Sequence, residues 1–177
     1  MSYYVQRRKK MDTYNNEDLI KYFNLYSKMV YRLAFIQLKT REQAEDILQD
    51  VFIKLMGQST SFESDEHVKA WLLKTTINCC KDYWKSAWFR KRVSLEETSE
   101  ATTTSHTNTT YGFVTECVKR LPIKYRQIIH LYYYEEYSLS EIAHILALNE
   151  NTVRTRMSRG RQLLKKYLGK EADNYEF

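Results

Sequence analysis

Apolar residues recur at steps of three and four along the first half of the chain, which is the spacing of one face of an α-helix. Three such stripes cover residues 17–38, 40–57 and 66–92, and a polar loop separates the last two. The buried sides of the first two are assigned to Leu19, Tyr22, Phe23, Tyr26, Met29, Val30, Leu33, Ile36, Ala44, Ile47, Leu48, Val51, Phe52, Leu55 and Met56. The pattern therefore predicts a first domain of three helices, residues 1–93.

Between residues 94 and 111 the composition changes to Thr, Ser, Glu and Asn, with hardly any large apolar side chains. Such a stretch buries too little apolar surface to offset the entropy of ordering it, so it is predicted to be a flexible linker. Helical spacing resumes near Phe113 and predicts four shorter helices in a second domain, residues 112–177. The predicted fold class is all-α, with two small helical domains joined by a flexible linker.

Two of the short helices have the pattern of a helix-turn-helix. Ser138 and Glu141 have the spacing of a capping box, so a helix is expected to start there. It breaks around Ala147 and restarts at Asn149, the expected N-cap of the last helix. Glycine is often found at the position of Ala147, where alanine is less comfortable if the backbone needs a positive φ. The second domain is predicted to contain a helix-turn-helix.

The last helix has an apolar stripe through Val153, Met157 and Leu164 and a cationic face elsewhere. No acidic residue lies between Glu150 and Glu171. A solvated helix face normally mixes signs and gains ion pairs one turn apart, so a basic face that merely aids solubility is the weaker interpretation. The pattern favours DNA binding. The residues expected to contact DNA are Asn151, Arg154, Thr155, Ser158, Arg159, Arg161, Lys165 and Lys166.

The second helix presents a different kind of surface. If its apolar stripe faces inward, Asp46, Gln49 and Asp50 are exposed together on neighbouring turns. A basic chain with an acidic patch on one helix and a cationic helix elsewhere is expected to have two partners, one protein and one DNA. An ordinary solvated helix surface is the alternative interpretation.

The third helix combines cations with aromatic side chains near its end, as proteins that bind single-stranded nucleic acid do. The alternative is that the aromatic residues belong to the core, and this interpretation is adopted for Trp71 and Tyr83. Trp84 and Trp88 fall on or beyond the exposed edge. The candidate residues for a single strand are Asn78, Lys81, Asp82, Trp84, Lys85 and Trp88.

The remaining composition narrows the function classes. The net charge of +6 suits a polyanionic partner. Cys79, Cys80 and Cys117 are interpreted as small buried residues of a reduced, cytoplasmic protein, because no Cys/His spacing suits a metal. No catalytic set, phosphate-binding loop or membrane span stands out. The sequence predicts a protein without enzymatic activity, metal or cofactor.

In this arrangement the chain resembles the extracytoplasmic-function sigma factors of bacterial RNA polymerase, over nearly its whole length. The motifs that carry the resemblance are Ala44-Glu45-Asp46-Ile47-Leu48-Gln49-Asp50-Val51-Phe52, Leu121-Pro122, Ser140-Glu141-Ile142-Ala143, Thr152-Val153-Arg154 and Met157-Ser158-Arg159-Gly160-Arg161. The first is similar to the family's region two point two and the others to its region four. The family has these two domains without the larger middle domain of housekeeping factors.

The resemblance implies a role for each surface. Asp46, Gln49, Asp50 and Phe52 would dock on the clamp helices of the largest polymerase subunit, and the flap of the second-largest subunit would be another contact. The third helix would capture the melted minus-ten element. The last helix, with Thr152 added to its contact residues, would bind the minus-thirty-five element. An anti-sigma factor is a common partner in the family, and the start of the chain is expected at either Met1 or Met11.

Two other classes were weighed against this interpretation. A one-component regulator would need an apolar dimer face or a ligand pocket in its first domain, and the exposed Asp46, Gln49 and Asp50 argue against one. A nuclease or recombinase would need clustered carboxylates or a nucleophile beside the basic helix, and the sequence shows neither.

Overall fold

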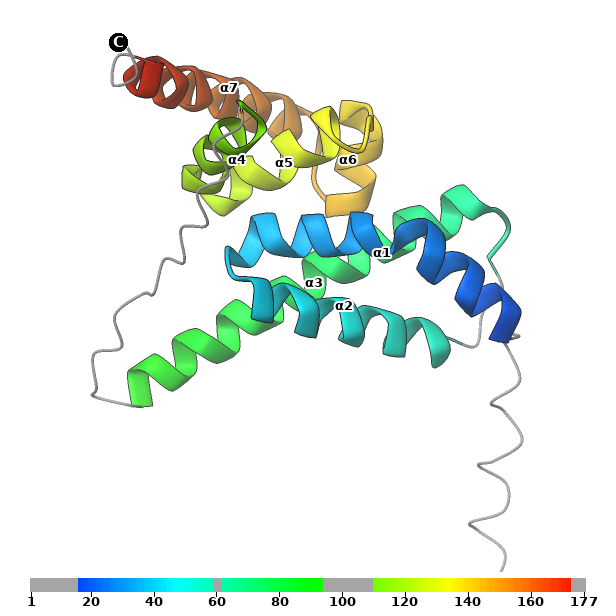
Figure 1. Ribbon diagram of the computed structural model, residues 1–177. Helices are drawn as coiled ribbons and strands as arrows, with labels where there is room; N and C mark the ends of the chain where they lie inside the picture. Colours follow the sequence, from blue (N-terminus) through cyan, green and yellow to red (C-terminus); the bar gives the residue numbers. More distant parts are fainter. Residues whose placement is uncertain (1–15, 59–61, 94–109, 173–177) are drawn as a thin grey trace, which may run out of the picture. The chain divides into compact units, whose positions relative to one another are not determined.

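The computed structural model describes residues 16–58, 62–93 and 110–172, and every regular element in these ranges is an α-helix. The helices are α1 (Asn16–Leu38), α2 (Arg41–Met56), α3 (Asp65–Val93), α4 (Thr110–Arg120), α5 (Ile123–Tyr133), α6 (Leu139–Leu146) and α7 (Glu150–Ala172), as labelled in Figure 1. The all-α prediction is confirmed. Most of the predicted linker, residues 94–109, lies outside the described ranges.

The helices form two compact units. The first unit contains α2, α3 and α1 as far as Ala34, and the second contains α4 to α7 together with residues Phe35–Thr40. No helix within the described ranges is long and apolar enough to cross a lipid bilayer.

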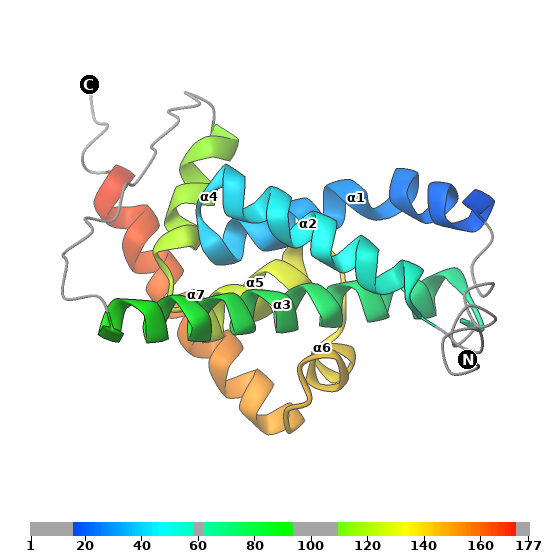
Figure 2. The ribbon, with the colours of Figure 1, turned by 90° about the horizontal axis from the view of Figure 1, so that it is seen from below.

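The core of the first unit comes from the apolar stripes that the sequence predicts. Val30 and Leu33 of α1, Val51 and Leu55 of α2, and Leu72 of α3 are all completely buried. Helices α2 and α3 pack side by side, as Figure 2 shows. Burying a large aliphatic side chain stabilises a fold by roughly 1.5–3 kcal/mol, so this shared core holds the three helices together.

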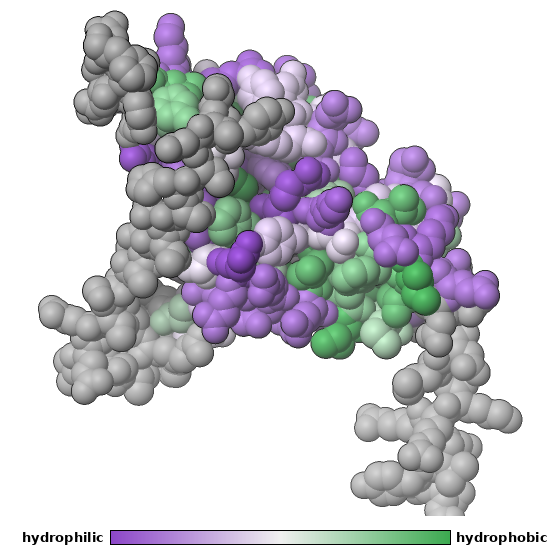
Figure 3. All heavy atoms as spheres, in the orientation of Figure 1, coloured by the Kyte–Doolittle hydropathy of each residue, from purple (hydrophilic) through white to green (hydrophobic). Residues whose placement is uncertain are grey.

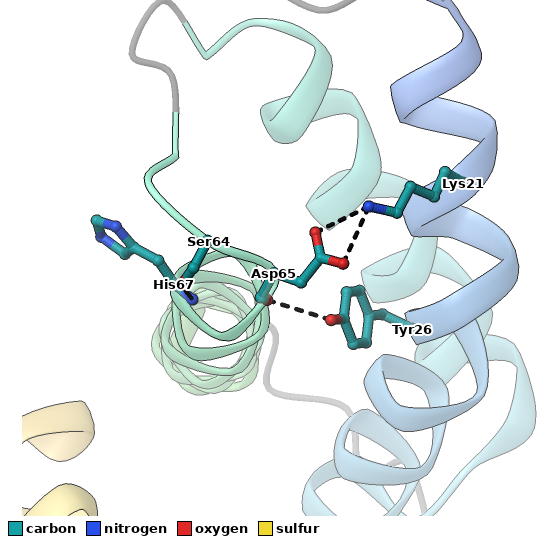
Figure 4. Close-up of polar contacts among 5 residues, drawn as sticks. All are labelled: Lys21, Tyr26, Ser64, Asp65 and His67. Atoms are coloured by element: carbon teal, nitrogen blue, oxygen red, sulfur yellow. Dashed lines mark hydrogen bonds and ion pairs between the residues drawn. The ribbon is translucent and has the colours of Figure 1, made fainter.

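A polar cluster fixes the start of α3 against α1 (Figure 4). Ser64 caps α3, because its Oγ accepts a hydrogen bond from the His67 backbone N–H at 3.1 Å. Both carboxylate oxygens of Asp65 lie 2.9 Å from Lys21 Nζ, and the hydroxyl of Tyr26 donates to the Asp65 carbonyl. The hydrogen bond with Asp65 is the main reason that the pKa of Lys21 is raised. Helix α3 therefore begins at Asp65, one residue before the predicted position.

In the second unit α7 packs against α4, α5 and α6. Its Val153 and Met157 are buried with Ile129 of α5 and Ile142 of α6. The two helices come close at Gly160, where an added Cβ would lie 3.3 Å from the Cβ of Tyr125. The glycine that completes the predicted stripe therefore lets the two helices touch.

The predicted capping box is present at the start of α6. Glu141 N–H donates to Ser138 Oγ, while Glu141 Oε2 accepts from the Ser138 backbone N–H at 2.8 Å and from its hydroxyl at 2.6 Å. These hydrogen bonds stabilise the carboxylate and lower the pKa of Glu141. Their contribution to stability is thus present above the ordinary value of 4.5 and is lost as the pH falls through the lowered pKa.

In the turn between α6 and α7, Ala147 has the positive φ that is uncomfortable for alanine. Ala147 has φ 52° and ψ 50°, in the left-handed region. This turn lets the Leu148 N–H donate to the Ala143 carbonyl at 2.9 Å, and the Ala147 N–H bonds to the last carbonyls of α6. Asn149 then caps α7 by accepting from the Asn151 N–H at 2.8 Å. The turn thus changes the direction of the chain between α6 and α7 and leaves one alanine in a strained conformation.

We expect Ala147→Gly to raise the stability of the second unit by about 0.5–1 kcal/mol, because relief of the left-handed strain outweighs the extra entropy of glycine in the unfolded chain. Hydrogen exchange of the α6 and α7 amides measures this. His144→Gly is the control, since His144 is exposed and helical and glycine there brings only its entropic cost. Equal or lower protection in Ala147→Gly would contradict the strain argument.

Candidate nucleic-acid interface

The first turns of α7 expose most of the side chains that the sequence predicts for DNA contact. Asn151, Arg154, Thr155, Ser158 and Arg159 are exposed. Thr152 is half-buried, and the buried Val153 and Met157 lie on the opposite side. The helical period thus places the polar groups together on one surface, while their contact with DNA stays a prediction.

Two of these side chains already have partners on their own helix. Arg154 Nε lies 3.1 Å and its Nη2 2.5 Å from Glu150 Oε1, one turn earlier. The hydroxyl of Thr155 donates to the Asn151 carbonyl at 2.8 Å and keeps its oxygen lone pairs for other donors. Arg159 has no hydrogen-bond or ion-pair partner among the described residues.

Farther along α7 the structure separates three cations that the sequence grouped together. Lys165 and Lys166 are exposed as expected. The guanidinium of Arg161, in contrast, lies over the rings of Tyr132 and Tyr133 of α5, 5.3 and 5.6 Å from their centroids. Cation–π contacts of this kind hold the cation against the partner helix. Arg161 is nevertheless exposed, so its side chain packs against α5 and also lies on the outward face, and its contact with DNA stays a prediction.

On α3 the exposed candidates are Asn78, Lys81, Asp82, Trp84 and Lys85. The indole of Trp84 is 40% exposed and meets the ring of Tyr83 edge to face at 6.3 Å. Lys85 Nζ lies 3.4 Å from Asp82 Oδ1, and both side chains are exposed. A long ion pair in solvent is weak and does not hold either side chain firmly. An aromatic face and mobile cations are thus accessible together.

Two further aromatic expectations concern the same helix. The side chain of Trp88 lies outside the described residues. Trp71 and Tyr83, assigned to the core, are only half-buried, and Trp71 packs edge to face against Phe62 at 5.7 Å. Both residues therefore belong to the border of the core rather than to its interior.

The predicted docking face of α2 is exposed at Asp46, Gln49 and Asp50. Phe52, which was grouped with them, is only 6% exposed, and its ring packs edge to face against Phe23 at 5.0 Å. The burial of Phe52 confirms its predicted place on the apolar stripe, and its side chain turns toward α1 and supports the exposed face from beneath.

This face has an apolar extension that the sequence pattern did not predict. Ile53 and Met56 of α2 are 62% and 58% exposed, and Ile20 and Phe23 of α1 are exposed as well. Met56 and Phe23 had been assigned to the buried stripe. Figure 3 shows hydrophobic atoms gathered over the adjoining parts of α1 and α2. The signal was available in the spacing, because Ile53 and Met56 follow Asp46, Gln49 and Asp50 at helical steps on one face.

All three cysteines are buried and free. Burial raises the pKa of the Cys80 thiol to about 12, with a smaller contribution from the neighbouring Cys79. The thiol is therefore protonated at neutral pH, as expected for a small buried residue rather than a reactive group.

Comparison with known proteins connects these surfaces to two family descriptions. Residues 22–90 match the description "Sigma-70 region 2", and residues 114–164 match "Sigma-70, region 4". The chain is 33% identical to RNA polymerase sigma factor SigV of Bacillus subtilis, over 80% of this chain and 85% of that protein. It is 29% identical to ECF RNA polymerase sigma factor SigM of Mycobacterium tuberculosis, over 83% and 75%.

Two solved structures share the fold. The sigma factor RpoE, in complex with the anti-sigma factor NepR from Bartonella quintana, aligns with a TM-score of 0.67 at 21% identity, over 86% of this chain and 98% of that one. CnrH, in complex with the cytosolic domain of CnrY, aligns with a TM-score of 0.63 at 19% identity, over 88% and 90%.

Replacing Arg161 by alanine should destabilise the second unit by about 0.5–1 kcal/mol, because the cation–π contacts with α5 are lost. Hydrogen exchange of α5 and α7 in the full chain measures this change. The control is Lys166→Ala, which removes an exposed cation of the same helix and should leave protection unaltered. If Arg161→Ala is as stable as the wild type and instead changes which bases are preferred, Arg161 reads DNA.

Proposed function

Since the chain belongs to the RNA polymerase sigma factors of the extracytoplasmic-function type, we propose that its two units divide promoter recognition between them. The second unit binds the double-stranded minus-thirty-five element. The first unit binds core polymerase and the melted minus-ten element. The observation that carries this proposal is the exposed face of α7, which is cationic and hydrogen-bonding and belongs to the second helix of a capped helix-turn-helix. Residues 94–109 would serve as the linker between the two domains, because the last two residues of the predicted linker, Thr110 and Tyr111, begin α4.

Within α7 we propose two roles for the exposed residues. Arg154, Thr155, Ser158 and Arg159 lie in its N-terminal half, the part of a recognition helix that enters the major groove, and would read bases. Lys165 and Lys166 lie where a helix leaves the groove and would hold phosphates. Asn151 and Thr152, at the start of α7, would be further contacts.

The first unit would dock on the clamp helices of the largest polymerase subunit through Asp46, Gln49 and Asp50. The exposed Ile53 and Met56 support this proposal, because protein interfaces commonly surround an apolar centre with polar groups. Phe52 would act indirectly by holding the face in place. The second unit would contact the flap of the second-largest subunit.

On α3 the accessible indole of Trp84 would stack against an unpaired base, and Lys81 and Lys85 would hold the strand's phosphates. Asn78 and Asp82, exposed on the same helix, would offer hydrogen bonds to base edges. Trp88 would extend this surface.

We further propose that the chain has no catalytic activity of its own, since phosphodiester chemistry would belong to the polymerase. Its place of action would be the cytoplasm. An anti-sigma partner is supported by the solved structure of the sigma factor RpoE, which is a complex with the anti-sigma factor NepR. The same exposed surfaces of the first unit would be available to such a partner.

Asp50→Lys should abolish association with core polymerase while leaving the fold intact, because it places a cation against a basic partner at an exposed site. Ile53→Asp should weaken association through the apolar part of the same face. Pull-down with core polymerase, paired with circular dichroism, measures both. Glu63→Lys makes the same charge change at an exposed residue before α3 and should bind normally. Normal binding by folded Asp50→Lys would remove α2 as the docking site.

Arg159→Ala should weaken the binding free energy for the preferred minus-thirty-five duplex by about 1–3 kcal/mol. It should also reduce the ratio between the affinities for the matched and the scrambled duplex. Lys165→Ala should weaken both duplexes alike and reduce the salt slope by about one unit. Binding of the full chain to matched and scrambled duplexes over a salt series compares the two variants. If Lys165→Ala collapses the matched-to-scrambled ratio and Arg159→Ala leaves it unchanged, the reading and anchoring roles are reversed.

A further inference from the structure

Glu150 is the first residue of α7 and the only carboxylate on this helix before Glu171. Its Oε1 accepts hydrogen bonds from both Nε and Nη2 of Arg154, at 3.1 and 2.5 Å. The two side chains remain 40% and 62% exposed. A negative group therefore stands at the start of a surface that is otherwise cationic and built to approach DNA.

The ion pair uses one particular edge of the guanidinium. Arg154 gives its Nε and Nη2 side to Glu150, and its Nη1 has no hydrogen-bond partner among the described residues. The terminal edge formed by Nη1 and the second hydrogen of Nη2 thus stays available. This edge is the one that can donate two parallel hydrogen bonds to O6 and N7 of a guanine.

Glu150 stabilises the helix only modestly. An exposed pair one turn apart contributes about 0.3–0.5 kcal/mol, and a carboxylate at the positive end of the helix dipole contributes about 0.3–1 kcal/mol. A carboxylate in the first turn also repels the phosphates that the neighbouring cations attract. For a helix that only needed affinity for DNA, a neutral residue at this position would bind more tightly.

We propose that Glu150 determines specificity by holding Arg154 in the orientation in which its terminal edge reads a guanine of the minus-thirty-five element. The inference rests on the proposed insertion of α7 into the major groove. Glu150 acts through Arg154 and is therefore a positioning residue. Without it, the long side chain of Arg154 swings to a phosphate, which adds affinity for any sequence and removes the preference for guanine.

The test is binding of the full chain to a duplex library randomised across the minus-thirty-five element. Wild-type protein should prefer guanine at one position, and Arg154→Ala should lose that preference. Glu150→Gln and Glu150→Ala should reduce it about five- to tenfold, the lower part of the range for one bidentate base contact. Both Glu150 variants should bind scrambled duplex more tightly than wild type. The double variant Glu150→Ala with Arg154→Ala should have the same guanine preference as Arg154→Ala alone, because Glu150 acts only through Arg154.

Glu136→Gln removes a carboxylate from an exposed position of the same unit and should leave the base profile unchanged. Circular dichroism verifies that each variant is folded. An unchanged guanine preference in folded Glu150→Gln and Glu150→Ala overturns the inference. If Arg159→Ala and Lys165→Ala behave as expected in the same assay, that failure concerns Glu150 alone. If no α7 variant changes DNA binding, the proposed function fails first.

Discussion

Close contact between α7 and α5 sets the direction of every functional side chain in the second unit. It depends on Gly160, where an added Cβ would lie 3.3 Å from the Cβ of Tyr125 and 3.4 Å from Cγ1 of Ile129, closer than side chains usually pack. A glycine inside a helix costs about 1 kcal/mol relative to alanine, which here is offset by the packing that it allows. Because α7 lies flat on α5, its opposite side faces solvent as one continuous surface. The contact of Arg161 with Tyr132 and Tyr133 extends this seam along α5 beyond Ile129.

Local chemistry at the helix ends supports that seam. The capping box of Ser138 and Glu141, the left-handed turn at Ala147 and the Asn149 cap follow one another within twelve residues. Each satisfies backbone groups that a helix end leaves without partners. Together they fix where α6 stops and where α7 starts, so the exposed first turn of α7 is held at a defined place on the unit.

Most of the fold could be predicted from the sequence because helix periods and caps are local signals. The spacing located all seven helices and found Ser138, Glu141, Asn149 and the strained Ala147. Helix α3 starts one residue earlier than predicted, and α7, predicted to be short, has 23 residues. It failed at the edges of helix faces. A period states which side is apolar, but it does not show that the ring of Phe23 packs against Phe52 while Met56 stays exposed. The pairing of Arg161 with two tyrosines and of Arg154 with Glu150 likewise needed three-dimensional positions.

The absence of carboxylates between Glu150 and Glu171 has a consequence for the unbound protein. Cations crowded on one side of α7 repel one another, and ions of the solution screen that repulsion. Added salt therefore stabilises the folded state of the second unit. The same ions compete for phosphates and loosen a complex with DNA. The stability of this unit and its affinity for DNA thus change in opposite directions with ionic strength. The salt concentrations that stabilise the free domain most are those at which it binds a nucleic acid most weakly.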